Sequence, residues 1–322
     1  MALQMGKHCY CEKPLTHSVY EARMIRELAA KKNLATQMGT QKHATDNYRR
    51  VVELVSGGAI GPVEEVHAWC GKDRKATRPS GQHPPVPEHL DWDLWLGPAP
   101  YRAYDPCYVP ANWRWWWDYA NGLLGDMGCH YMDLPFWALQ LRHPTKIEAT
   151  GPPVDAETTP RTLKVRYEFP ARESLPPVKL TWYHGPEPPA VLKQKGLPIW
   201  KRRGSGPVSG VLFVGREGML MADFNRRKLF PESKYDDFQP PEPSIADSPG
   251  HHQEWITACK TDAPTTCNFD YSGALTEAVL LGNVAFRTGK QLQWDAQHLK
   301  AVSCPEAERL IRREYRKGWS LL

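Results

Sequence analysis

The first sixty residues alternate short β-prone runs with amphipathic helical stretches, and this order constrains the fold more than any other feature. Residues 8–11 and 34–38 are predicted strands. Residues 19–29, with Thr16 as the expected N-cap, and residues 48–55 carry apolar side chains at helical spacing. A strand–helix–strand–helix order is typical of an α/β sheet with parallel strands.

The pattern changes after residues 61–62, a Gly-Pro pair. The later β-prone runs are separated by loops rich in proline and glycine, as in a mostly antiparallel sheet. These runs are residues 63–69, 163–169, 178–184, 211–214 and 219–222. Further helices are predicted at residues 122–139, 251–260, 271–288 and 305–316. The fold class is therefore α/β, with two predicted domains: an α/β unit over residues 1–60 and an α+β domain over residues 61–322.

The charge and cysteine content exclude several classes of protein. The 41 basic and 36 acidic residues give a net charge of +5, spread along the chain rather than concentrated in the basic stripe of a nucleic-acid binder. No apolar stretch approaches the ~20 residues needed to cross a bilayer. The eight cysteines include no Cys-x-x-Cys pair, which favours reduced thiols and a cytoplasmic location. We therefore expect neither a nucleic-acid nor a membrane partner.

A first candidate site is the tripeptide Glu12, Lys13 and Pro14, which follows the first predicted strand directly. Open α/β sheets bind ligands at the carboxyl ends of their strands. A lysine ammonium at this place could lower the pKa of a substrate hydroxyl or stabilise an alkoxide. The tripeptide is equally compatible with a surface ion pair before a turn, and the pattern alone leaves both interpretations open.

A second candidate site is the pair Asp126 and His130 in the glycine-rich helix predicted to begin at residue 122. Their i, i+4 spacing places both side chains on one helix face, and Asp133 continues that face. A carboxylate beside an imidazole suits a proton-transferring histidine. A buried structural polar pair and an Asp/His/Asp metal site are the alternatives that the spacing leaves open.

Two further clusters carry a less specific signal. Tryptophan faces can stack on a sugar, although packing in the core explains such a cluster equally well. The tryptophans concerned are Trp113, Trp115, Trp116 and Trp117. A basic side of the last predicted helix is interleaved with glutamates and is interpreted as a solvated face. Its members are Arg309, Arg312, Arg313, Arg316 and Lys317.

In combination these motifs resemble the glucose-fructose oxidoreductase / inositol dehydrogenase / rhizopine-catabolism family (Gfo/Idh/MocA). The resemblance rests on residues 11–15, residues 37–41 and the glycine-rich helix at 122–130, with support from residues 90–98, 112–114 and 268–270. It implies a Rossmann domain followed by a C-terminal domain whose large, mostly antiparallel sheet has helices on one face. It also implies hydride transfer between NAD or NADP and a CH–OH group of a sugar or polyol, and a homo-oligomer formed through the C-terminal sheet.

The resemblance assigns roles residue by residue. Lys13 matches the catalytic lysine of the family, His130 its catalytic acid/base, and Asp126 the carboxylate that accompanies the histidine. The positions that match the neighbourhood of the cofactor are Glu12, Lys13, Pro14, Gln41, Trp113 and Arg114. The resemblance implies no metal ligand, and it gives Asp133 no role.

One family feature has no counterpart before the first strand. The family binds the cofactor pyrophosphate on a Gly-x-Gly-x-x-Gly turn that opens a helix, and no such turn precedes Glu12. The nearest match, residues 204–210, has different spacing and precedes a predicted strand. We therefore expect residues 1–60 to be the C-terminal remnant of a Rossmann domain, with ~80–100 residues absent before Met1.

The sequence leads to three hypotheses about function. The first is an NAD(P)-dependent sugar or polyol dehydrogenase, whose activity would be impaired by loss of the phosphate-binding turn. The second is a redox-elimination glycoside hydrolase or lyase of the same family, which would retain its NAD without net reduction. The third is a catalytically silent oligomerisation or binding module, which would bind no nicotinamide nucleotide.

Overall fold

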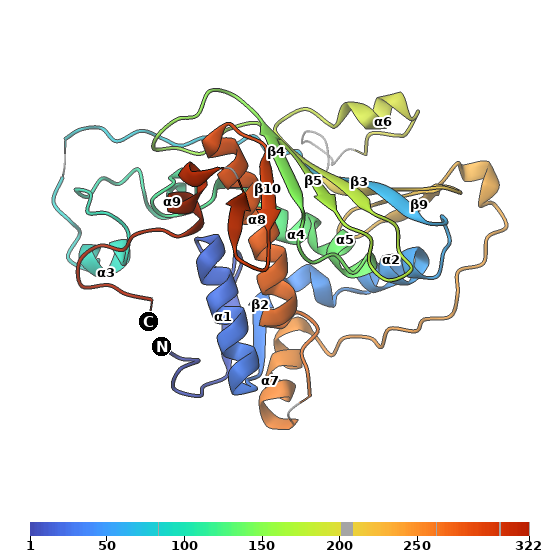
Figure 1. Cartoon of the computed structure of the whole chain (residues 1–322), viewed down its shortest axis with the longest axis horizontal. Helices are drawn as coiled ribbons and strands as arrows, with labels where there is room; N and C mark the ends of the chain where they lie inside the picture. The colour runs from blue at the N-terminus through green and yellow to red at the C-terminus, as the bar shows by residue number, and fades with distance from the viewer. Residues whose placement is uncertain (83, 201–208, 262, 303, 322) are drawn as a thin grey trace.

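Two sheets of unequal size organise the chain (Figure 1). The computed structural model describes residues 1–82, 84–200, 209–261, 263–302 and 304–321. Most of the glycine-rich run at residues 204–210 therefore lies outside the described residues.

The smaller sheet consists of the parallel strands β1 (Cys9–Glu12) and β2 (Thr36–Gly39), joined by helix α1 (Val19–Lys32). The predicted N-cap at Thr16 is wrong by two residues. Ser18 caps α1 because its hydroxyl accepts the N–H of Glu21 while the Glu21 carboxylate accepts the N–H of Ser18, a capping box that satisfies two backbone donors.

The larger sheet has nine strands in the order β11-β10-β4-β5-β6-β3-β7-β8-β9. Every neighbouring pair is antiparallel except β3 and β6. The strands are β3 Val63–Cys70, β4 Lys146–Thr150, β5 Leu163–Phe169, β6 Val178–His184, β7 Gly210–Gly215, β8 Met219–Ala222, β9 Arg227–Phe230, β10 Leu292–Asp295 and β11 Lys300–Val302. The prediction of a mostly antiparallel sheet after residue 61 is confirmed. The domain boundary itself stays a prediction.

The remaining helices connect and cover these sheets. They are α2 Asp46–Ser56, α3 Trp92–Leu96, α4 Gly122–Tyr131, α5 Asp133–Ala138, α6 Ala190–Gln194, α7 His251–Thr261, α8 Phe269–Thr288 and α9 Glu308–Ile311. Short 3-10 turns are η1 Gln41–Ala44, η2 Asn112–Trp115, η3 Glu232–Lys234 and η4 Pro305–Ala307. Within the described residues, no helix combines the length and the apolar character that a membrane span requires.

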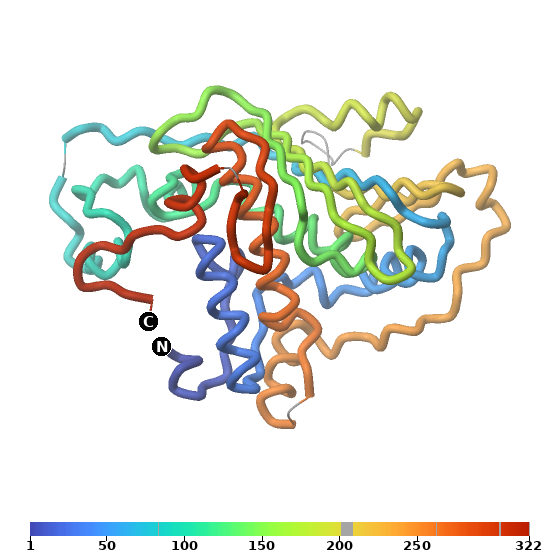
Figure 2. The backbone as a smooth tube through the Cα atoms, in the orientation of Figure 1, coloured from blue at the N-terminus to red at the C-terminus, as the bar shows by residue number. Residues whose placement is uncertain are grey.

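Two helix predictions are corrected by the structure. The single helix expected over residues 122–139 is divided into α4 and α5, because Pro135 has no N–H to donate into the preceding turn. The helix expected over residues 305–316 ends at Ile311. From there the chain is extended, and Figure 2 shows it running back toward the N-terminal end, with Arg316 donating its N–H to the carbonyl of Pro98.

Helix α4 approaches its neighbours closely through its glycines. At Gly122 the backbone has a φ of +62°, and a Cβ there would collide with the side chain of Thr159. At Gly128 a Cβ would lie 3.4 Å from the side chain of Val279 on α8. The smooth face predicted from the glycine spacing is thus used for packing within the protein.

Helix α8 lies between α1 and the larger sheet, and sixteen of its residues are buried (Figure 1). Arg23 of α1 forms a bidentate ion pair with Glu277 of α8, with Nη2 2.9 Å from Oε2. Glu277 is 1% exposed, and the indole N–H of Trp294 also donates to it. The Arg23–Glu277 pair therefore connects α1 to α8, and the Trp294 hydrogen bond connects α8 to β10 of the larger sheet.

Replacing Arg23 with Met is expected to lower the free energy of unfolding by about 3 kcal/mol, because the buried Glu277 carboxylate loses its bidentate arginine and is left with His143 and the Trp294 N–H as partners. The double variant Arg23→Met/Glu277→Met is expected to recover most of this loss. Arg166→Met, which removes an exposed arginine 3.7 Å from Glu148, is the control and should cost less than about 1 kcal/mol. Urea unfolding measures all three; equal losses for Arg23→Met and Arg166→Met would contradict the argument.

Candidate functional site

A cleft of about 580 Å³ opens between the carboxyl end of β1 and the beginning of α4. Its size is within the range of about 300–1,000 Å³ typical of small-molecule sites. The structure brings together most of the predicted site residues here. The predicted residues that line the cleft are Glu12, Lys13, Pro14, Trp113, Arg114 and Asp126.

Lys13 and Asp126 form the central contact of the cleft. The Lys13 ammonium donates to the Asp126 carboxylate and, over 2.7 Å, to the main-chain carbonyl of the same residue. Both side chains are more than four-fifths buried. Burial acts to raise the pKa of Asp126, but the charge and hydrogen bond of Lys13 outweigh it and the pKa is lowered. The ammonium is therefore fixed in position by an ionised carboxylate.

His130 lies one turn further along α4, is half-buried and is not among the residues that line the cleft. Burial, followed by the positive charge of Lys13, lowers the pKa of His130 to about 4. The imidazole is therefore neutral at pH 7. Its Nδ1 is buried and has no hydrogen-bond partner among the described residues. Asp126 is bonded to Lys13 and not to His130, which differs from the pairing that the i, i+4 spacing indicates.

Glu12 and Gln41 lie at the adjoining ends of β1 and β2. The Gln41 amide donates to the Glu12 carboxylate at 3.3 Å, and the Tyr10 hydroxyl donates to it at 3.1 Å. Gln41 itself is not among the residues that line the cleft, and it reaches the cleft through Glu12.

The tryptophan cluster divides between two environments. Trp113 lines the cleft, and the Arg114 guanidinium lies over its ring at 4.5 Å and 4.0 Å from the Asp126 carboxylate. Trp116 and Trp117 are buried in the interior at 0% and 4% exposure. One tryptophan is therefore placed for ligand contact, whereas these two pack in the core.

Sequence reasoning missed four residues with polar side chains that line the cleft. They are Thr16, His17, Tyr119 and Asn121. Asn121 immediately precedes the glycine-rich helix, so its position next to the motif is a signal that could have identified it. His17 and Tyr119 belong to no motif, because only the folded chain brings them to the cleft.

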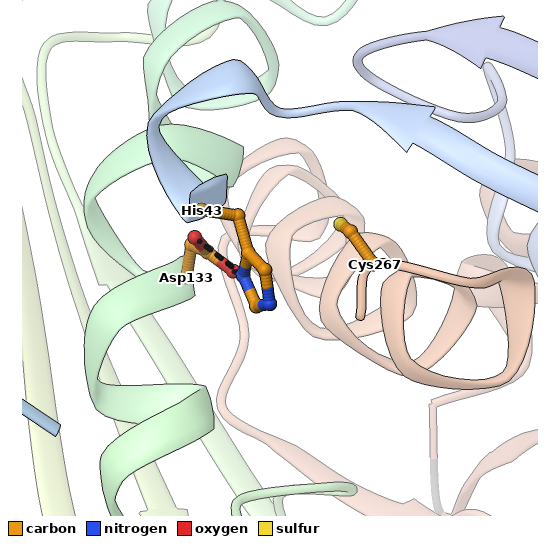
Figure 3. A group of neighbouring side chains, drawn as sticks. All are labelled: His43, Asp133 and Cys267. Carbon is orange, nitrogen blue, oxygen red and sulfur yellow. Dashed lines mark hydrogen bonds and ion pairs between the residues drawn. The ribbon is translucent and has the colours of Figure 1, made fainter. Parts of the chain in front are cut away.

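Asp133 belongs to a separate buried cluster (Figure 3). Its carboxylate accepts a hydrogen bond from His43 Nδ1 at 2.9 Å and one from the Tyr271 hydroxyl at 2.6 Å. Cys267 completes the cluster, with potential ligand atoms of His43, Asp133 and Cys267 lying within 4.8 Å of one another. Burial raises the pKa of the Cys267 thiol well above its usual value, so the thiol is protonated. Asp133 thus faces His43 and Tyr271, not Asp126.

Part of the chain matches a known family model. Residues 56–172 match the Gfo/Idh/MocA family model described as "Oxidoreductase family, C-terminal alpha/beta domain". This segment is similar to the C-terminal domain of the Gfo/Idh/MocA oxidoreductases. It contains Trp113, Arg114, Asp126 and His130, whereas Lys13 precedes it. A comparison with curated proteins by sequence finds no match.

Solved structures share the fold over most of the chain. An oxidoreductase domain protein from Kribbella flavida has a TM-score of 0.58 and 18% identity, covering 90% of this chain and 74% of that one. The WlbA dehydrogenase from Bordetella pertussis, solved with NADH and UDP-GlcNAcA, has a TM-score of 0.57 and 15% identity, covering 91% and 74%. GenD2 from gentamicin A biosynthesis, solved with NAD, has a TM-score of 0.57 and 17% identity, covering 92% and 74%.

Replacing Lys13 with Met is expected to raise the pKa of His130 from about 4 toward the ordinary histidine value. The variant removes a cation that opposes protonation and leaves the charge of Asp126 to favour it. Titration of the His130 ring protons by NMR measures the shift. Lys290→Met, which removes an exposed lysine paired with Glu306, is the control. The same His130 pKa in all three proteins would contradict the arrangement.

Proposed function

We propose that this chain is an NAD(P)-dependent oxidoreductase that acts on a CH–OH group of a sugar or polyol. The observation that carries the proposal is the Lys13–Asp126 ion pair in the cleft, with the neutral His130 one helical turn away. An ammonium and an unprotonated imidazole are the two groups that removal of a hydroxyl proton requires. The family of the larger domain, which consists of oxidoreductases, supports the same reaction class.

The residues of the cleft fit the nicotinamide end of the cofactor. The flat faces of Trp113 and Tyr119, together with the polar groups of Glu12 and Lys13, suit a planar aromatic amide. Gln41 and Arg114 lie next to these groups, and Pro14 forms part of the wall. Relatives of the same fold were solved with NAD or NADH. When bound, the nicotinamide supplies the hydride acceptor or donor.

The division of labour follows from the geometry of this chain. His130 is neutral at pH 7 and can accept the hydroxyl proton of the substrate. The Lys13 ammonium can stabilise the negative charge that develops on the substrate oxygen as that proton leaves. Asp126 holds the ammonium and acts on His130 only through space, since the described residues contain no hydrogen bond between the two.

The substrate class is supported by the composition of the cleft wall. Indole and phenol faces can stack on the C–H face of a sugar ring, and Asn121 and Thr16 add amide and hydroxyl groups. A relative from Bordetella pertussis was solved with the sugar nucleotide UDP-GlcNAcA. Homo-oligomer formation through the larger sheet remains an expectation from the family.

Lys13→Met and His130→Asn are each expected to lower turnover by roughly a hundredfold or more, because each removes a group that handles the reacting proton or the charge it leaves. The assay follows nicotinamide reduction with a panel of polyols and aldoses. Lys7→Met and His298→Asn, at exposed positions outside the cleft, are the matched controls and should leave turnover unchanged. Full turnover in both the Lys13 and the His130 variant would refute the assignment.

Cofactor titration separates this proposal from its alternatives. Saturable calorimetric binding of NAD or NADP, competed by the other nucleotide, is expected from the nicotinamide-facing residues. Absence of any binding would instead favour a non-catalytic binding module. Tightly retained NAD together with release of a sugar leaving group, without net nicotinamide reduction, would favour redox elimination.

A further inference from the structure

A second, smaller cavity lies behind the cleft. It has a volume of about 50 Å³ and is formed where the beginning of α1, the end of α8 and helix α9 meet. The polar side chains of its wall include His17, Asn121, Asn283, Arg287, Arg309 and Arg313. His17 and Asn121 line both cavities and therefore form the partition between them.

The three arginines of this cavity have no carboxylate partner. In the part of the chain that the structure describes, no salt bridge involves Arg287, Arg309 or Arg313. Arg287 lies over the ring of Trp117 at 4.9 Å, and Arg313 lies 5.7 Å from the ring of Tyr315. Aromatic contacts thus orient two of the guanidinium groups while leaving their charge uncompensated.

Two acidic residues near these arginines are bonded elsewhere. Asp118, whose charge acts on Arg287, accepts a hydrogen bond from Arg102 at 2.6 Å. Glu21 accepts the N–H groups of His17 and Ser18 at the beginning of α1 and the hydroxyl of Tyr315. Neither carboxylate is among the residues that line the cavity.

His17 reflects the positive surroundings. Its Nε2 lies 2.9 Å from the carbonyl of Trp117 and donates to it, and its Nδ1 is buried without a partner among the described residues. Burial first, and then the charge of Arg313, lowers the pKa of His17 to about 3, with Arg287 contributing in the same direction. The imidazole is therefore neutral, and the described residues that line the cavity include three arginines and no carboxylate.

We propose that this cavity binds one small oxyanion of the phosphate class. Unpaired guanidinium groups are the protein's usual partners for phosphate. The first turn of α1 also lines the cavity, through Ser18 and Val19. A volume of about 50 Å³ accommodates a few water molecules or one such ion.

This assignment revises the sequence interpretation of the basic C-terminal helix. Two of its five basic residues, Arg309 and Arg313, face the cavity, whereas Arg316 is paired with Asp93 on α3. The basic side is therefore not a uniformly solvated face. The Arg287 contribution from α8 lies outside that motif and was not anticipated.

The probe for the test is inorganic phosphate, titrated calorimetrically into the full 322-residue chain. The expected result is saturable binding of one ion per chain, together with a thermal unfolding midpoint that rises with phosphate concentration. Arg313→Gln and Arg309→Gln should each weaken the affinity about tenfold or more, because a charge-assisted hydrogen bond is lost. Arg216→Gln removes an arginine that is 65% exposed and paired with Glu64, and should leave the affinity unchanged.

An NMR measurement on the unmodified chain locates the bound ion and does not require that the arginine variants fold. Bound phosphate offsets the charge of Arg313 and Arg287, so it should raise the pKa of His17 from about 3. The ring protons of His17, followed by NMR at rising phosphate, measure this shift, with His298 as the exposed reference. Non-saturable binding, equal affinity in the three variants, or an unchanged His17 pKa would each overturn the proposal.

Discussion

The packing of α8 between α1 and the larger sheet is the interaction on which the rest of the molecule depends. The buried pair of Arg23 and Glu277 fixes α1 against α8, and Gly128 lets α4 approach Val279 on the same helix. Lys13 and Asp126 are thereby both positioned from one helix, because α1 follows the strand that ends immediately before Lys13 and α4 carries Asp126. Residues 113 positions apart in the sequence meet in a single ion pair as a result.

The proximity of cations to buried imidazoles sets the electrostatics on both sides of the partition. In the cleft, burial and then Lys13 keep His130 neutral, which makes it a proton acceptor. In the second cavity, burial and then Arg313 keep His17 neutral. Burial and a nearby cation act on both histidines, but the net charge around them differs. Asp126 neutralises the charge of Lys13, whereas the arginines near His17 have no carboxylate partner within the described residues.

The sequence predicted the periodic features of this fold well. The Glu12–Pro14 motif lies at the carboxyl end of β1, and the change of pattern after residue 61 marks the beginning of the larger sheet. The pairing of Asp126 could not be predicted in the same way, because i, i+4 spacing defines a helix face and not the element opposite that face. The N-cap of α1 likewise depends on whether the hydroxyl of Thr16 or that of Ser18 reaches the N–H of Glu21. Hydrophobic periodicity does not distinguish these two residues.

The second cavity could not be predicted from the sequence, for a related reason. Its arginines come from α8, from α9 and from the extended segment after α9, so no local motif contains them. Alternating Glu and Arg residues predict a solvated helix only if the helix continues, and this one ends at Ile311. Once the helix ends, Arg313 is no longer held on the solvent side of a regular helix. The place where α9 ends, rather than the spacing of its charged residues, therefore determines whether the Arg313 side chain lies in solvent or lines the cavity.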